Sequence, residues 1–399
     1  MVRFASLFSQ LLAIFPRTEF QSAVRAQRAE RYAKGFSCWN QFVAMLFCQL
    51  AQAHSLREIC QGLTCCLGKL QHLGVVDAPN KSTLAYANQR RPWQLYEAVF
   101  GQLLAKCQPL GLGKRKFRFK NKLYSLDSTV IELCVSVFDW AKFQTTKGAV
   151  KLHLLLDHDG YLPTFAVITE GNVHDVRIAQ KMAFPRGSFL AIDRGYVDYN
   201  LFGRWTEEEV WFVTRLKDDA VYEVVEVREL PNRTGVLRDE VIQLGSEKTG
   251  NLCAYFLRRI EFRDEKANRV LVFLTNNLVL AAATIAEIYK ERWKVELFFK
   301  AIKQNLRIKT FVGTSANAVR VQIWTALIAI LLLKYLQLRS KLGWALSNLV
   351  ALLRWNLFTY RDLWKWIDDP FDTPPLGARP EQLVLALERV GQQAGGPHL

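Results

Sequence analysis

The sequence predicts a mixed α/β sheet with an all-helical domain before it and helices after it, and three observations support this fold class. Residues 1 to about 110 carry helical periodicity almost throughout. After a linker at 111–122, runs rich in β-branched residues alternate with short helical segments, which is the pattern of an α/β sheet. Towards the other end, an amphipathic helix and then a strongly apolar helix from about Asn317 complete the fold.

The first 110 residues are expected to form a helical DNA-binding domain. A helix, the loop "GVVDAPNK" and a second helix that opens with Ser82 as its N-cap resemble a helix-turn-helix arrangement, with Arg90 and Arg91 on the second helix. Any helical bundle contains such helix pairs, so this arrangement alone does not separate a DNA-binding domain from a neutral scaffold. The charge of the segment favours DNA binding.

The chain is strongly basic, and the surplus is unevenly spread. Its 53 Lys and Arg against 37 Asp and Glu give a formal charge of +16 over 399 residues. Residues 1–120 hold 17 basic and 5 acidic side chains, so 17 − 5 = +12 lies near the start. Such a field attracts polyanions, of which nucleic acid is the commonest large one. A generally basic protein without a polyanionic partner is the alternative.

The central region is expected to be a core in two parts, separated by a β-rich insertion. The first part covers 111–219, the insertion with its four β-rich runs covers 220–276, and the core resumes at 277–310. The first part contains, in order, strand 122–133, hairpin 149–171 with the turn "DHDG", helix 175–184, strand 188–195, helix 200–209 and strand 210–217.

The last part of the chain is expected to be a C-terminal helical region at 311–370, followed by a mobile Pro- and Gly-rich tail at 371–399. The apolar run "IWTALIAILLL" has only eleven residues, which is too few to span a bilayer, so we expect a buried core helix and no membrane segment. Eight irregularly spaced cysteines without a CxxC pair indicate reduced thiols in a cytoplasmic protein rather than zinc ligands.

The helix predicted for "IYKERWKVELFFKAIKQNL" places its polar residues unusually. At about 100° per residue, Tyr289, Arg292, Glu296 and Lys303 share a strip roughly 60° wide. This strip lies between an apolar face and a second apolar border that includes Trp293. A solvated helix face is not normally confined in this way, so we expect the strip to hold a ligand.

Two aspartates stand out by their positions in predicted strands. Asp127 lies within the first strand, and Asp193 closes the strand "FLAIDRG". Carboxylates in buried strands are costly unless they are paired or bind a cation, and ligands gather at the strand ends of α/β sheets. A capping or turn role is the alternative for either aspartate alone. Asp157 and Asp159, by contrast, lie in a hairpin turn, where aspartate is ordinary.

Together with Glu296, the two strand aspartates are suited to hold two hard divalent cations through oxygen. Such a pair of ions activates a water or a 3′-hydroxyl in phosphodiester displacement. Arg292, Lys303 and Tyr289 on the same strip would bind phosphates beside the scissile bond, and Trp293 offers a surface for an unstacked base. The combination indicates an enzyme that cuts or joins DNA.

These residues carry a family resemblance. The pattern Tyr289-x2-Arg292-x3-Glu296-x6-Lys303 resembles, at every position and spacing, the signature of the insertion-sequence-four group of bacterial DDE transposases. The segments "LDST", "IDRGY", "LTNN" and "WNQFVAMLFCQLAQAHSLREICQGL" are also similar to that group. The resemblance covers about 5–365.

The resemblance implies a ribonuclease H-like catalytic fold that is interrupted by the β-rich insertion. It also implies a cut-and-paste reaction that depends on two Mg²⁺ ions, for which Mn²⁺ substitutes. The implied metal-binding and catalytic carboxylates are Asp127, Asp193 and Glu296. The implied contacts to the transposon end are Tyr289, Arg292, Lys303 and, for a flipped base, Trp293.

The expected partners are double-stranded DNA, as transposon ends and target, and a second copy of the chain in a homodimeric synaptic complex. The expected location is the bacterial cytoplasm, on the nucleoid when the protein is bound to DNA. His174 and Asp175 in "EGNVHD" are similar to a recurrent family segment, but a helix N-cap with a neighbouring polar residue explains them equally well.

Three functions are compatible with these features. The first is a transposase, the second is a nuclease or resolvase that cuts without joining, and the third is a catalytically inactive DNA-binding regulator. The intact carboxylate triad argues against the regulator. The complete signature and the insertion favour the transposase over the nuclease, and short inverted repeats flanking the coding region are then expected.

Overall fold

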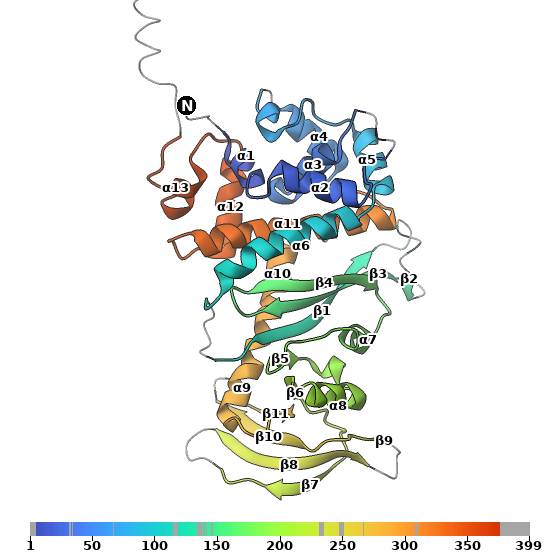
Figure 1. The fold of residues 1–399 in the computed structure, drawn as a ribbon, viewed down its shortest axis with the longest axis vertical. Coiled ribbons are helices and arrows are strands. Elements are labelled where there is room, and N and C mark those ends of the chain that lie inside the picture. The colour runs from blue at the N-terminus through green and yellow to red at the C-terminus, as the bar shows by residue number, and fades with distance from the viewer. Residues whose placement is uncertain are drawn as a thin grey trace, which may run out of the picture.

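The computed structural model describes residues 5–375 with short gaps. The gaps lie at 32, 34, 67, 115–118, 134–137, 139, 141, 145–146, 231–234, 247–250, 266, 307 and 309. The tail expected at 371–399 therefore falls outside the described residues from 376 onward, as does part of the linker expected at 111–122. In Figure 1 a helical layer lies above a sheet that continues to the bottom of the molecule.

Five strands form the sheet expected from the first part of the core. They are β1 (Leu123–Leu133), β3 (Lys147–Asp157), β4 (Leu162–Glu170), β5 (Phe189–Ile192) and β6 (Trp211–Arg215). Their order is β4-β3-β1-β5-β6, and the short strand β2 (Lys142–Gln144) also pairs with β3. The first three strands pair antiparallel, whereas β1, β5 and β6 run parallel. This is the ribonuclease H-like arrangement, so the expected fold class is confirmed.

The β-rich segment at 220–276 does not form a sheet of its own. It contributes β7 (Tyr222–Val227), β8 (Val236–Ser246), β9 (Asn251–Leu252), β10 (Leu257–Asp264) and β11 (Arg269–Thr275). Because β11 pairs antiparallel with β6, the core sheet continues as β6-β11-β10-β8-β7. The insertion expected from the sequence is therefore an extension of the core sheet, visible at the bottom of Figure 1.

Four helices accompany the sheet: α7 (Asp175–Ala179), α8 (Tyr199–Glu207), α9 (Ala282–Glu291) and α10 (Trp293–Asn305). Strand β5 shows why both faces of the sheet are covered. Leu190 and Ile192 pack into the core that contains α8, whereas Phe189 and Ala191 pack into the core that contains α9. Successive side chains of a strand point to opposite faces, so an unbroken apolar strand needs a helix on each side.

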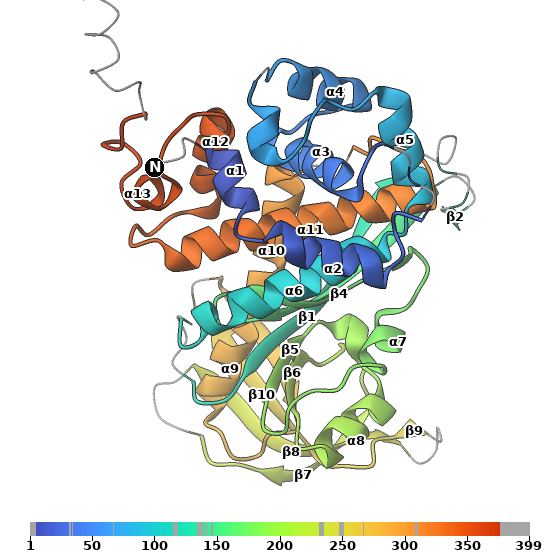
Figure 2. The same cartoon turned by 45° about the horizontal axis from the view of Figure 1, so that its top comes forward.

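The helical layer combines both ends of the chain. Its helices are α1 (Leu7–Leu12), α2 (Arg17–Ala26), α3 (Cys38–Ala51), α4 (Leu56–Thr64), the 3-10 helix η1 (Leu70–Leu73), α5 (Lys81–Arg90), α6 (Gln94–Gly111), α11 (Ala316–Arg339), α12 (Leu346–Asn356) and α13 (Leu363–Asp368). They share one apolar core with β3 and α10. In Figure 2, α6 and α11 lie side by side over the sheet.

Helix α11 is the centre of this layer. Its Trp324 stacks on Trp93 with ring centroids 6.3 Å apart and meets the ring edge of Phe100 on α6 at 5.2 Å. Among the described residues, α11 is the one helix long and apolar enough to cross a membrane, and 83% of its apolar window is buried inside the structure. That degree of burial is typical of a core helix and agrees with the expected role.

The helix pair proposed as a helix-turn-helix differs in detail from the expectation. Helix α5 begins at Lys81 with Asn80 in the N-cap position, so the prediction of Ser82 as the N-cap is wrong. The connection from α4 to α5 contains η1 and is longer than the tight turn of that motif. Arg91 donates to the carbonyl oxygens of Ser37 and Phe36, which makes it an internal anchor of the layer.

Removal of residues 1–110 is expected to abolish folding, and not only DNA binding, because α11 would lose the apolar surface of α3 and α6. The deleted chain should show no cooperative thermal transition by circular dichroism. A deleted chain that unfolds cooperatively and still selects its own DNA ends over random DNA would contradict both this prediction and the assignment of DNA binding to 1–110.

Candidate active site

Strand pairing brings the two predicted aspartates together. Strands β1 and β5 run parallel, with Leu126 opposite Ile192, so Asp127 and Asp193 are each the next residue along their strands. Asp127 lies inside β1, and Asp193 follows directly after β5. The two carboxylates therefore leave neighbouring strands at the same level of the sheet, where ligands gather in such folds.

Glu296 approaches from α10, and the helix that carries it is not continuous. The predicted single helix is wrong at Arg292: α9 ends at Glu291, and α10 begins at Trp293. At the break the N–H of Arg292 bonds the Tyr289 carbonyl oxygen at 3.0 Å, which is a tighter turn than that of an α-helix. The break separates Tyr289, on α9, from the three other residues of the predicted strip.

Arg292 lies between two of the carboxylates. Its Nη2 is 2.5 Å from Glu296 Oε1, and its Nη1 is 3.6 Å from Asp127 Oδ2. The side chain of Arg292 is 12% exposed, so the charge of the guanidinium is poorly screened by water. Arg292 thus balances part of the negative charge that the carboxylates bring together.

The pKa of Asp127 reports this concentration of negative charge. Burial of the carboxyl group is the largest cause that raises its pKa, and the charges of Asp193 and Glu296 raise it further. The N–H of Ser128, which donates to Asp127 Oδ1 at 2.8 Å, and the charge of Arg292 act in the opposite direction. The result is a pKa of about 6 in place of 3.8. Asp127 is therefore a costly anion unless a cation binds it.

The other predicted residues occupy different surroundings. Lys303 Nζ donates to Thr129 Oγ1 at 2.5 Å and so joins α10 to β1. Trp293, at the start of α10, is 56% exposed. Tyr289 is only 8% exposed, and its ring packs at 5.0 Å on Phe273. The helical projection did not anticipate this packing role, because Phe273 comes from β11.

A groove of about 430 Å³ opens at the site. It is lined by Asp127, Ser128, Thr129, Glu296, Phe299, Lys300, Lys303 and Gln304. The lining combines carboxylates from β1 and α10 with two lysines. The groove can therefore receive a phosphate backbone, with a cation between the phosphate and the carboxylates. Among the residues that the structure describes, no three His, Cys, Asp or Glu side chains are already arranged to hold a metal.

The donor set nevertheless fits a hard divalent cation. Three carboxylates carry oxygen atoms of the kind such an ion prefers, and both burial and the charges of Asp193 and Glu296 raise the pKa of Asp127, so a bound cation would relieve its charge. Arg292 bonds Glu296 in this arrangement, and Glu296 has to leave Arg292 before it can ligate an ion.

Asp175 lies near the site, although the sequence alone did not separate a functional role for this residue from a structural one. Its Oδ1 forms an ion pair with Lys151 Nζ at 2.9 Å and lies 3.3 Å from His153 Nδ1. Burial would raise its pKa, but hydrogen bonds from His153, Lys151 and Ser128 outweigh burial and lower the pKa to about 2. The pairing of β1 with β3 places His153 opposite Ser128, and this pairing is the feature that could have pointed to Asp175. His174 occupies the N-cap position of α7, as the N-cap explanation requires, but its side chain makes no capping hydrogen bond.

Asp157 and Asp159 have the structural role expected of a hairpin turn. Lys122 Nζ bonds one carboxylate oxygen of each, at 2.8 Å and 2.7 Å respectively. The two carboxylates lie at the β3–β4 turn, whereas the carboxylates of the site belong to β1, β5 and α10.

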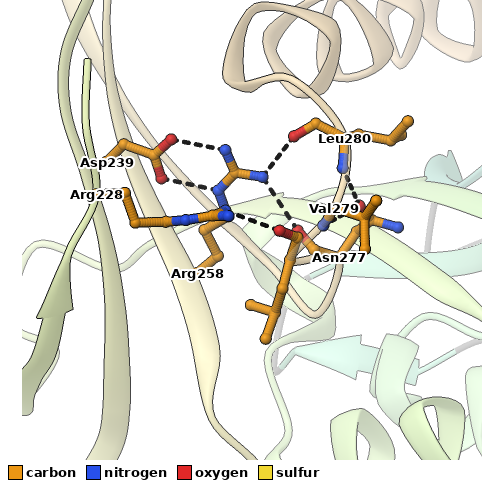
Figure 3. Close-up of polar contacts among 7 residues, drawn as sticks. Arg228, Asp239, Arg258, Asn277, Val279 and Leu280 are labelled. Atoms are coloured by element: carbon orange, nitrogen blue, oxygen red, sulfur yellow. Dashed lines mark hydrogen bonds and ion pairs between the residues drawn. The ribbon is translucent and has the colours of Figure 1, made fainter.

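The start of α9 is anchored by the strands of the insertion, as Figure 3 shows. The buried guanidinium of Arg258 on β10 makes two bonds to Asp239 on β8, at 2.8 Å and 2.6 Å, and donates to the Leu280 carbonyl oxygen at 2.5 Å. Asn277 Oδ1 accepts from the N–H of Leu280 at 2.8 Å, and Arg228 donates to the carbonyl oxygen of the adjoining Leu278 at 2.8 Å. Strands β8 and β10 therefore help to position the helix that leads to Arg292 and Glu296.

A ribonuclease H-like sheet that brings carboxylates together beside arginine and lysine defines a class of enzymes that cut or transfer nucleic acid strands. Residues 118–332 match the family model described as "Transposase DDE domain". Residues 4–76 match a domain of unknown function, DUF4372. The chain belongs to the DDE transposase family, and it is a DNA transposase.

Relatives in three bacteria agree with this assignment. A protein of Sinorhizobium fredii that is named a transposase is 31% identical over 76% of this chain and 84% of its own length. A protein of Geobacillus stearothermophilus named a transposase for an insertion sequence element is 29% identical over 65% of this chain and 68% of its own. A protein of Synechocystis with a similar name is 25% identical, over 66% and 73% respectively.

Among solved structures, a distant likeness extends over most of the chain. It is the cryo-EM structure of the piggyBac transposase synaptic complex with hairpin DNA, with a TM-score of 0.39 and 8% identity. The alignment covers 96% of this chain and 83% of that one. A likeness this distant has no bearing on the site.

Proposed function

We propose that the protein binds the terminal inverted repeats of its own insertion sequence and moves the element by a cut-and-paste reaction. In this reaction a phosphodiester bond is hydrolysed at each end, and the freed 3′ ends are then joined to target DNA. The observation that carries the proposal is the meeting of Asp127, Asp193 and Glu296 from two parallel strands and a facing helix.

Members of this family use divalent metal ions, and we propose Mg²⁺ for this chain. Asp127, Asp193 and Glu296 would hold two ions, for which Mn²⁺ can substitute. When bound, such ions activate the attacking oxygen and stabilise the leaving oxygen of each displacement.

The basic residues of the site would bind and orient the DNA. Arg292 balances part of the negative charge of Asp127 and Glu296, and it would become available for a phosphate oxygen once cations take over that charge. Lys303 and Lys300 line the groove and would bind neighbouring phosphates. The exposed ring of Trp293 offers a stacking surface to a base that leaves the duplex.

The protein would act as a homodimer in the bacterial cytoplasm, where the DNA of the element lies. An insertion sequence has two ends, and each end needs one active site during excision. Two copies of the chain in one synaptic complex meet that requirement.

The test is to incubate the full chain with DNA fragments that carry the two ends of its own element, with Mg²⁺ and a target plasmid. Mapping of the products should show nicks at the element boundary, release of the element and joined products in the plasmid. Nicks without any joined product would support a nuclease and overturn the proposal. Cleavage at random positions would do the same.

Trp293→Ala is expected to weaken cleavage at the transposon end several-fold while the melting temperature stays within about 1 °C, because more than half of the side chain is exposed. Tyr289→Phe serves as the companion variant: it keeps the ring on Phe273 and removes only the hydroxyl. Cleavage assays and thermal melts on both proteins check the prediction. Unchanged end cleavage in both variants would mean that this side of the helices does not contact DNA.

A further inference from the structure

A second pocket lies on the other side of α10 from the active-site groove. It has a volume of about 400 Å³ and is lined by apolar side chains of α10 and α11, by the β3–β4 turn and by three lysines. These lysines are Lys114, Lys294 and Lys334. Three cationic side chains at one pocket favour an anionic occupant.

Lys334 is the most unusual of the three. It is a residue of the central helix α11 and is 8% exposed. Its ammonium group makes no hydrogen bond or ion pair with any residue that the structure describes, and it lies 5.8 Å from the ring centroid of Tyr161. Burial lowers its pKa from 10.5 to about 8. A buried ammonium group without an anion is energetically costly. An apolar side chain would fill the same position in the core without this cost, so a lysine there suggests a function.

Two of the three lysines, Lys114 and Lys294, have partners nearby. Lys114 donates to the carbonyl oxygen of Leu338. Glu291 lies 3.4 Å from His158 Nδ1 and 3.5 Å from the hydroxyl of the pocket residue Tyr161, and its charge also interacts with that of Lys294. The pocket itself is lined by no carboxylate.

The pocket and the active-site groove lie on either side of α10. Lys294, Leu297 and Ala301 line the pocket, whereas Glu296 and Lys300 line the groove. Two other large apolar side chains of α10, Trp293 and Leu297, are 56% and 43% exposed. A helix with its side chains is about 10 Å across, and a DNA strand rises about 3.4 Å per nucleotide. A strand that crosses α10 would therefore bring a phosphate over this pocket roughly three nucleotides from the scissile bond.

We propose that this lysine pocket binds a backbone phosphate of the DNA whose scissile bond lies in the active-site groove, with Lys334 as its central cation. The proposal rests on the proposed function, in which DNA contacts α10. The chemistry recognised is a phosphate dianion or diester, and the source we infer is DNA rather than a free phosphate ion. The pocket would add an anchor on the opposite side of α10 from the carboxylates.

The test compares Lys334→Met with the wild-type chain and with Lys365→Met, an exposed lysine on α13 as the matched control. Binding of a random-sequence duplex of about 30 base pairs is measured by fluorescence anisotropy in EDTA over a series of salt concentrations. Lys334→Met should bind roughly tenfold more weakly, and the slope of log K against log salt should fall by about 0.9. Its melting temperature should stay equal or rise, because an unpaired buried charge has been removed.

A second measurement separates the two sources of phosphate. An amine-reactive label is applied at pH 8, and modification of Lys334 is read by peptide mapping. Protection by the duplex, but not by inorganic phosphate at the same total phosphate concentration, is the expected result. Equal protection by inorganic phosphate, absence of protection, or a Lys334→Met variant with wild-type affinity and salt slope would each overturn the proposal.

These outcomes are independent of the carboxylate assignment, because the binding and labelling steps contain no divalent metal. If the lysine pocket did not bind DNA, the loss of cleavage expected for a Glu296→Gln variant would be unchanged. A failure of the carboxylate triad would likewise leave the salt slope of Lys334→Met unchanged.

Discussion

Glu296→Gln is expected to lower nicking and strand transfer by orders of magnitude while the protein stays folded. The substitution is nearly isosteric and removes one negative charge. The α10 residues Val295 and Phe299 remain buried in the core, so the helix keeps its packing. Both displacements need the same oxygen ligands for divalent metal, so both should fall together. Mn²⁺ should restore a little activity, because it tolerates neutral oxygen ligands better than Mg²⁺ does.

The control for this variant is Glu287→Gln on α9, an exposed glutamate outside the site. Melting temperature, binding to the element ends and Mg²⁺-dependent nicking are measured on one preparation of each protein. Binding by Glu296→Gln should persist or tighten, because one charge that faces the phosphates is gone. A stable Glu296→Gln protein that nicks at the wild-type rate would falsify the triad assignment.

Asp127→Asn is expected to abolish cleavage and, in the absence of metal, to stabilise the fold. Asp127 has a pKa of about 6 in the folded protein against 3.8 ordinarily. Because the folded pKa is the higher one, this group favours folding below pH 4, and that contribution is lost as pH rises through about 6. A difference of about two pKa units corresponds to at most about 3 kcal/mol at neutral pH. Asparagine does not ionise and can still accept from the N–H of Ser128.

Thermal melts in EDTA from pH 4 to pH 8 check this prediction. The melting temperature of Asp127→Asn minus that of the wild type should grow between pH 4 and pH 7 and then level off. Added Mg²⁺ should stabilise the wild-type protein and leave the variant almost unchanged, because only the wild type binds the ions tightly. A melting difference that is flat across this pH range would show that Asp127 is not held in an electrostatically unfavourable site.

Much of the catalytic sheet could be predicted from the sequence. The β3–β4 hairpin, β5 with Asp193 at its end, α8 and β6 all follow from local signals: alternation, turn residues and helical periodicity. Asp127 and Asp193 were recognisable because a carboxylate in an apolar strand is unusual, and a few neighbouring residues suffice to show it. The spacing of Arg292, Glu296 and Lys303 was also a local pattern.

What the sequence by itself determined was thus the identity of the strands and the residue types that they carry at the site. Only the tertiary structure decided which elements meet. Tyr289 is buried because Phe273 comes from a different strand, and the helix breaks where Arg292 reaches Asp127 and Glu296. The insertion extends the sheet because β11 finds an open edge at β6, and α11 closes over helices from the first hundred residues. Periodicity describes the neighbours along the chain, whereas these contacts depend on surfaces far apart in sequence, which become neighbours only after the chain has packed.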